Sequence, residues 1–189
     1  MLKVREDAQP RTMPVSGQVA PAKPLVETFD RIDARITSVL ARIGVPAVRI
    51  GLGVVFLWFG VLKFFPDLSP AADLATRTIE RLSFGVVTAE LALPLLAAWE
   101  TLIGLGLLSG RFLRATLLLL AVQMAGTVTP LILFPAEAFT QFPIAPTLEG
   151  QYIIKNLVLI GAAMVVGATV RGGGLVAEPP SRPTAGSDR

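Results

Sequence analysis

The sequence predicts an all-α membrane protein, a four-helix transmembrane bundle with up-down-up-down connectivity that follows an amphipathic surface helix. Composition is the first observation: 52% of the 189 residues are hydrophobic and only 16% are charged, with a mean hydropathy of +0.64. Soluble domains carry about 25% charged residues. The second observation is four long apolar stretches. A bilayer core about 30 Å thick needs about 20 apolar residues per helical crossing, and each stretch reaches that length.

The chain begins with a polar segment, residues 1–24, that holds four prolines and is expected to be a disordered cytoplasmic arm. Residues 25–43 follow with helical periodicity, because their apolar residues recur at steps of three and four. These residues are Phe29, Ile32, Ile36, Val39, Leu40 and Ile43. We expect an amphipathic juxtamembrane helix that lies on the bilayer and leads into the first crossing at Pro46. A solvated helix docked on the protein's own loops is the alternative.

Residues 44–171 are expected to form the membrane domain. Its predicted crossings are residues 45–65, 84–109, 112–134 and 151–170. A polar connection with a short helix over 74–82 separates the first two, and the turn Gly110-Arg111-Phe112 makes the second and third antiparallel neighbours. Small residues let helices approach closely in lipid. We therefore expect Gly53, Gly60, Gly104, Gly161 and Ala162 to face neighbouring helices. Residues 172–189 are expected to form a disordered cytoplasmic tail.

Lysine and arginine counts near the helix ends predict the orientation. One side of the membrane would hold seven arginines: Arg31, Arg35, Arg42, Arg49, Arg111, Arg114 and Arg171. On the other side Lys63, Arg77, Arg81 and Lys155 are diluted by acidic residues. The pattern predicts a multi-pass protein of the cell (inner) membrane with both termini in the cytoplasm.

Charged side chains inside the crossings are the candidate site residues. A charge near the bilayer centre costs about 2.5–3.5 kcal/mol, so each buried acid predicts a basic partner. With about 1.5 Å of rise per residue, Lys63, Glu90 and Lys155 fall at similar depths when the predicted crossings are centred on one another. They would form an outer cluster, to which Gln151, Tyr152 and Asn156 would add hydrogen bonds.

A second, inner site is predicted around Glu100. Arg49 falls at a similar depth, and Gln123 lies near the middle of the third crossing. Glu90 and Glu100 are about 15 Å apart along one helix, so they would not form a coupled dyad. Trp58 and Trp99 also lie inside crossings, either to stack on a ligand ring or as core or lipid-facing bulk.

Two interpretations of the buried charges remain open. In the first, the ion pairs only fix the register of the bundle. In the second, they line a polar pocket that binds a quinone or another small polar ligand, or that passes protons. The chain has no cysteine and no histidine, so it cannot hold an iron–sulfur cluster through thiolates or haem through imidazole. No metal site is expected. A net charge of +3 is too small and dispersed for a nucleic-acid surface.

Three stretches resemble the YkgB-like branch of the DoxX-like membrane proteins. They are Val55-Phe-Leu-Trp-Phe-Gly-Val-Leu-Lys-Phe-Phe-Pro66, Trp99-Glu-Thr-Leu-Ile-Gly104 with Gly110-Arg111, and Gly150-Gln-Tyr-Ile-Ile-Lys-Asn-Leu-Val-Leu159. The resemblance covers about residues 45–170. It implies four membrane helices and a link, in several members, to oxidative stress, sulfur oxidation or quinone-dependent redox complexes. Many relatives carry an aspartate where this chain has Asn156, which removes a negative charge beside Lys155.

Together these observations favour a non-catalytic or quinone-interacting membrane subunit of an oxidoreductase or oxidative-stress system, with no catalysis by the chain on its own. The expected partners are the lipid bilayer, redox proteins and further copies of the chain, without nucleic acid. A small-molecule transporter or permeation path is one alternative. A membrane anchor that recruits cytoplasmic partners through the amphipathic helix and the proline-rich N-terminal arm is another.

Overall fold

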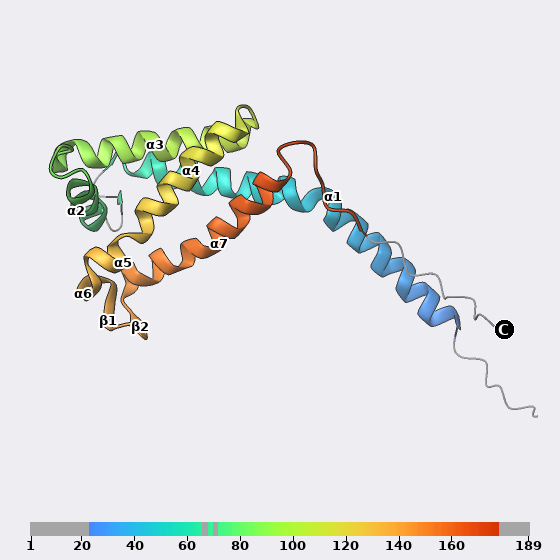
Figure 1. The fold of residues 1–189 in the computed structure, drawn as a ribbon. Helices are drawn as coiled ribbons and strands as arrows, with labels where there is room; N and C mark the ends of the chain where they lie inside the picture. The colour runs from blue at the N-terminus through green and yellow to red at the C-terminus, as the bar shows by residue number, and fades with distance from the viewer. Residues whose placement is uncertain (1–22, 66–67, 70–71, 178–189) are drawn as a thin grey trace, which may run out of the picture.

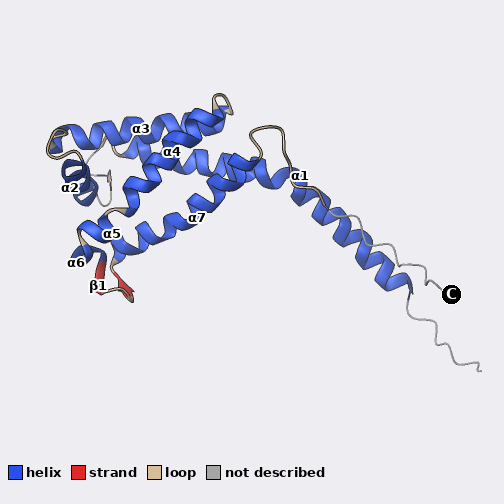
Figure 2. Ribbon diagram, viewed as in Figure 1, coloured by secondary structure: helices blue, strands red, loops and turns tan. Residues whose placement is uncertain are grey.

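The computed structural model describes residues 23–65, 68–69 and 72–177, and these are mostly helical (Figures 1 and 2). The elements are α1 (Lys23–Leu62), α2 (Ala72–Leu82), α3 (Ala89–Ser109), α4 (Leu113–Val128), α5 (Pro130–Leu133), α6 (Pro135–Ala138), β1 (Phe139–Gln141), β2 (Ala145–Pro146) and α7 (Leu148–Ala168). Four helical segments are long and apolar enough to cross a membrane: Glu27–Leu62, Ala89–Ser109, Leu113–Leu133 and Leu148–Ala168. The predicted all-α bundle with four candidate crossings is confirmed; its alternating direction relative to a membrane stays a prediction.

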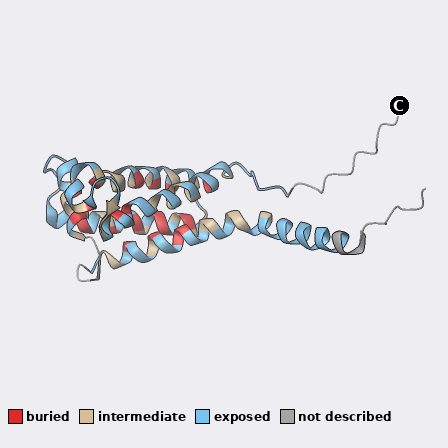
Figure 3. Ribbon diagram, turned by 90° about the horizontal axis from the view of Figure 1, so that it is seen from below, coloured by how far each residue is buried: buried red, intermediate tan, exposed pale blue. Residues whose placement is uncertain are grey.

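The juxtamembrane helix and the first crossing are one continuous helix, α1, where the sequence predicted two segments joined at Pro46. A proline ring removes one backbone hydrogen bond and bends a helix without always ending it. Figure 1 shows α1 bending between its projecting N-terminal half and the half that packs in the bundle. The projecting half is exposed (Figure 3). Its placement on a bilayer surface stays a prediction, and the predicted arm lies almost wholly outside the described residues.

The second crossing begins later than predicted. Phe84 and Gly85 both have positive φ angles and form a turn, and α3 starts only at Ala89 after the extended residue Thr88. Apolar residues at 84–87 extended the hydropathy signal beyond the true helix start. This five-residue difference changes the predicted depth of every polar side chain on α3.

The later elements depart from the prediction at their ends. The third crossing consists of α4 and α5, with Thr129 between them and Pro130 opening α5. The predicted loop 135–150 contains α6 and a short antiparallel hairpin, β1–β2. The last crossing, α7, begins at Leu148, where the Thr147 hydroxyl accepts a hydrogen bond from the Gly150 amide. Of the predicted tail, residues 172–177 are described and contain no helix or strand.

Helices α1 and α3 pack most intimately, through glycines. A Cβ on Gly53 would lie 2.8 Å from Leu108, and a Cβ on Gly60 would lie 2.7 Å from the Thr101 amide nitrogen. Gly104 in turn meets the backbone of Leu57. Along these three contacts the residue numbers increase on α1 and decrease on α3, so the two helices are antiparallel. The predicted packing role of these three glycines is confirmed.

The buried core joins the four long helices. Leu52 and Phe56 from α1 meet residues of α3, α4 and α7, namely Ile103, Leu107, Leu120, Met124 and Val166. Ala162 packs against this core, whereas nothing lies within 4 Å of a Cβ built on Gly161, so the prediction for Gly161 is wrong. Large apolar side chains such as Trp58, Leu102 and Val158 face outward. An apolar exterior around a small core fits a protein whose solvent is lipid.

Candidate functional site

The central polar cluster of the bundle consists of Lys63, Glu100 and Gln123. Lys63 Nζ lies 2.7 Å from Glu100 Oε2, and Gln123 Nε2 donates to Glu100 Oε1 at 3.0 Å. Only 16% of the Lys63 side chain and 10% of the Glu100 side chain are exposed. Both carboxylate oxygens of Glu100 are therefore satisfied, one by a charge and one by an amide, as burial of a carboxylate demands.

This cluster lies at the middle of the spans. Ten residues of α3 precede Trp99 and ten follow it, so Glu100 is one residue from the centre of the helix. Gln123 has the same central place in the span Leu113–Leu133. The centre of a bilayer is the most costly depth for charged side chains. Charged residues at this depth are usually functional or essential to packing.

Lys63 reaches this depth from the end of α1. The Cα–Cβ bonds of a helix tilt toward its N-terminus, so a side chain at the C-terminal end extends back along the helix. Lys63 Nζ accordingly also donates to the Phe59 carbonyl at 3.4 Å. The close contact of Gly60 with Glu100 and Thr101 brings the two backbones together beside the ion pair.

Two further side chains on α3 flank Glu100. The Trp99 indole Nε1 donates to the Leu119 carbonyl of α4 at 3.2 Å. Thr101 Oγ1 is buried and finds no hydrogen-bond partner within the described residues. An unsatisfied buried hydroxyl costs about 1–3 kcal/mol. The sequence analysis did not select Thr101. Its position next to Glu100 was the one signal in the sequence that could have identified it.

The predicted inner pair of Arg49 with Glu100 is wrong. Arg49 Nη1 donates to the Leu107 carbonyl at 2.8 Å and lies against Gly110, whose positive φ ends α3. The last carbonyls of a helix lack intrahelical partners and carry partial negative charge. Arg49 therefore caps α3 electrostatically at Leu107, which is about two helical turns along α3 from Glu100. Gln123 does join Glu100, as expected.

The predicted outer cluster of Lys63, Glu90 and Lys155 is also wrong. Lys63 pairs with Glu100, and Glu90 is exposed in the first turn of α3. An acid in this position complements the positive end of the helix dipole. Lys155 lies over the Tyr152 ring at 5.6 Å on the surface of α7.

The other α7 candidates do not reach the central cluster either. Gln151 and Tyr152 are exposed and Asn156 is half-buried. No hydrogen bond joins them to Lys63 or Glu100 among the residues described. A ligand-binding role for these α7 residues stays a prediction.

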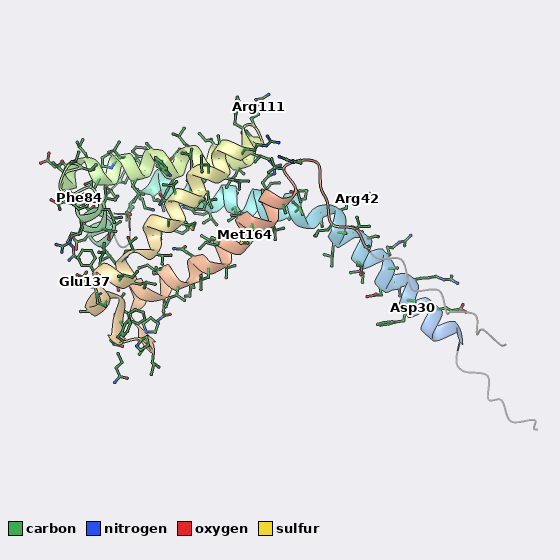
Figure 4. All side chains as sticks on the ribbon, viewed as in Figure 1. Asp30, Arg42, Phe84, Arg111, Glu137 and Met164 are labelled. Atoms are coloured by element: carbon green, nitrogen blue, oxygen red, sulfur yellow. The ribbon has the colours of Figure 1, made fainter. Side chains whose placement is uncertain are left out.

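A second polar group joins α2 to α6 at the end of the bundle opposite the α3–α4 turn (Figure 4). Arg77 binds Glu137 through both guanidinium Nη atoms, contacts Asp73 at 2.9 Å, and lies 5.4 Å from the Phe134 ring centroid. Two open hollows of about 620 and 690 Å³ flank this arginine. Arg77 was expected from the sequence only as part of a connection, and its partner was not predicted.

The Arg77–Glu137 pair makes the α2–α6 contact pH-dependent. Hydrogen bonding from Arg77 lowers the pKa of Glu137 below its ordinary value, and the same bond raises the pKa of Arg77. A carboxyl with a lowered folded-state pKa stabilises the fold above its unfolded pKa, and this contribution is lost as pH falls through the folded pKa. We expect acidification below pH about 4 to loosen α2.

Hydrogen exchange of α2 amides against pH measures this loss. In Glu137→Gln the α2 amides should exchange faster at neutral pH, and most of the acid-dependent component should be lost. Glu80→Gln is the matched control, because Glu80 makes no ion pair in the described part of the chain. Because Asp73 also contacts Arg77, a smaller acid response can remain in Glu137→Gln; a response as large as that of the parent chain would contradict the assignment.

Fold and site together define a multi-pass helical membrane protein with an ion pair at mid-span. No group of three or more acidic, histidine or cysteine side chains gathers within the residues described. Residues 44–136, which cover α3, α4 and the bundle part of α1, match the model of the family described as DoxX. Over these residues, just under half of the chain, the protein is similar to the DoxX family, while the narrower resemblance to the YkgB-like branch stays a prediction. Comparison with curated proteins and with solved structures gave no match.

Proposed function

We propose that this DoxX-like protein is a non-catalytic membrane subunit of an oxidoreductase or oxidative-stress system, and that it binds the headgroup of a quinone at Lys63, Glu100 and Gln123. The observation that carries the proposal is the ion pair at mid-span, with its buried amide partner. The link to redox systems comes from the family resemblance.

The hydrogen-bonding inventory of the cluster suits a quinone. An ammonium has three N–H donors and a carboxamide has two. Lys63 uses two donors, on Glu100 and Phe59, and Gln123 uses one, on Glu100, within the described residues. One donor of each remains for a ring carbonyl. Thr101 Oγ1 and the Glu100 carboxylate can accept from the hydroxyls of the reduced quinol.

Tryptophan fluorescence provides the test, because the chain has only Trp58 and Trp99 and quinones quench indole emission. In Trp58→Phe the signal comes from Trp99, which adjoins Glu100. Titration of the purified variant with decylubiquinone should give saturable quenching. Gln123→Leu in the same background should weaken the apparent affinity at least about tenfold, the equivalent of one lost hydrogen bond in an apolar site.

The matched control is Trp99→Phe, in which outward-facing Trp58 reports instead. Its quenching should rise linearly with quinone, as partition into the detergent micelle predicts. Equal, non-saturating curves for both single-tryptophan proteins would overturn quinone binding at this site. Substrate flux into proteoliposomes that disappears in Gln123→Leu would favour the permeation path instead.

Orientation in the cell (inner) membrane, with both termini cytoplasmic, is part of the proposal. Arg42, Arg49 and Arg111 gather toward the end of the bundle from which α1 projects (Figure 4). Positive residues favour the cytoplasmic side. The chain has no cysteine, so a single cysteine placed at Arg111 can report its side. Labelling of that cysteine from outside intact cells by an impermeant maleimide would contradict this orientation.

A further inference from the structure

The N-terminal half of α1 carries an apolar stripe that nothing in the described structure covers. Its residues are Phe29, Ile32, Ile36, Val39, Leu40 and Ile43, with exposed fractions from 49% to 71%. Figure 3 shows this half of the helix projecting beyond the bundle. Isolated helices in water are marginally stable without burial of an apolar face. The stripe therefore requires an occupant.

The spacing of the stripe is that of a coiled-coil seam. Phe29, Ile32, Ile36, Val39 and Ile43 follow one another at steps of three, four, three and four. Apolar residues at this average interval of about 3.5 residues let two helices wrap around each other with interlocking side chains. Pro46 takes the next seam position, so the seam ends where α1 joins the bundle.

Charge disfavours a lipid surface as the occupant. Helices that lie on anionic bilayers usually carry an excess of lysine and arginine on the polar face. Here three acids, Glu27, Asp30 and Asp33, offset all but one of the four basic residues of this half of α1, which are Lys23, Arg31, Arg35 and Arg42. Glu27 and Arg31 also approach one another at 3.8 Å.

The charges beside the seam permit a second copy in parallel register. Arg35 and Arg42, seven residues apart, lie on one flank of the stripe, and Asp33 and Leu40 lie on the other. In a parallel pair the two different flanks of the helices face each other. At the usual offset of five residues, Arg35 of one copy lies beside Leu40 of the other and Arg42 lies beside Ala47, so no like charges oppose each other there.

The membrane itself imposes the parallel arrangement. Copies inserted in the same orientation hold their α1 helices in the same direction and at the same height, because α1 continues into the bundle. Confinement in the bilayer raises the effective concentration of the partner, which compensates for a seam of little more than two heptads. Within the described residues, the C-terminal segment approaches α1 through Leu175 at Gly44, which is not a seam position.

We propose that the stripe Phe29–Ile43 is a self-association surface, through which copies of this chain form a parallel coiled coil next to the membrane. The inference is independent of quinone binding, because it uses no residue of the central cluster. It assigns an oligomerisation role to a segment that was expected, from the sequence, to lie on the bilayer surface.

Site-specific cross-linking tests the proposal in membranes. Ile36→Cys puts the chain's single thiol in the seam, whereas Ala34→Cys puts it on the exposed opposite face. In a parallel, in-register coil the two thiols introduced at position 36 face each other and can form a disulfide. Mild oxidation with copper phenanthroline and O₂ should yield a covalent dimer from Ile36→Cys, at least about tenfold more than from Ala34→Cys, a ratio equivalent to about 1.4 kcal/mol.

The mass of the detergent-solubilised full chain gives the second readout. Light scattering should find more than one copy for the parent chain, a single copy for Ile36→Glu, and the parental mass for Ala34→Glu. Equal cross-linking at both positions, or a parent chain with the mass of one copy, would overturn the proposal. Quenching of a fluorophore at position 36 by brominated lipid would identify a lipid-lying helix instead.

Discussion

Lys63→Met is expected to lower the free energy of unfolding by about 3–5 kcal/mol, because it leaves the Glu100 carboxylate buried without its counter-charge. The Lys63–Glu100 distance of 2.7 Å and the 10% exposure of the Glu100 side chain show that the ammonium, and not solvent, is the main partner of this carboxylate. Gln123 donates one neutral hydrogen bond and does not compensate a full charge. Equilibrium unfolding of the purified protein by SDS in mixed micelles measures the loss.

The double variant Lys63→Met/Glu100→Met separates structure from function. Replacing both members of a buried ion pair by apolar side chains of similar size is often neutral or stabilising. We therefore expect it to recover most of the stability lost in Lys63→Met. Lys155→Met, which removes an exposed lysine, should change stability by less than about 1 kcal/mol. A double variant no more stable than Lys63→Met would contradict a direct charge pairing.

Quinone titration of the double variant then distinguishes the two interpretations of the buried charges. A stable double variant that no longer shows saturable Trp99 quenching would support a ligand site. A stable double variant with unchanged quenching would mean that the ion pair fixes helix register only. The comparison with the parent chain is informative because the double variant keeps both Gln123 and Trp99.

The helices were predictable from the sequence because their signals are local. Long apolar stretches mark the four crossings, and steps of three and four mark the N-terminal half of α1. Helix ends were less predictable. Phe84 is as apolar as a span residue, yet its positive φ places it in a turn. Pro46 could equally have ended a helix or bent one, and only packing decides which occurs.

The partners of the buried charges were not predictable, because they depend on the register between helices. Centring the predicted spans on one another assigned Lys63 to Glu90, whereas the glycine contacts set Gly60 against Thr101 and bring Lys63 to Glu100. Hydropathy does not encode this offset. Gln123 was predictable as a partner of Glu100 because both lie near the centres of their helices, where errors at the ends matter least.

Register depends on small residues, so enlarging one of them should disturb the whole site. Gly104→Ala is expected to destabilise the protein by at least about 1–3 kcal/mol, as overpacking of a well-packed contact does. A Cβ at this position would overlap the Leu57 backbone, which cannot move as a flexible side chain can. SDS unfolding measures the loss, and near-UV circular dichroism should show altered packing around Trp99.

Gly51→Ala is the matched control for this substitution. It makes the same chemical change in α1, but nothing lies within 4 Å of the added methyl group. Alanine favours a helix over glycine by about 1 kcal/mol, so this variant should be as stable as the parent or more stable. Equal effects of the two substitutions would show that helix propensity, and not the contact with Leu57, controls stability. Because the α1–α3 contact also sets the depth of Lys63, Gly104→Ala should weaken quinone quenching as well, whereas Gly51→Ala should leave it unchanged.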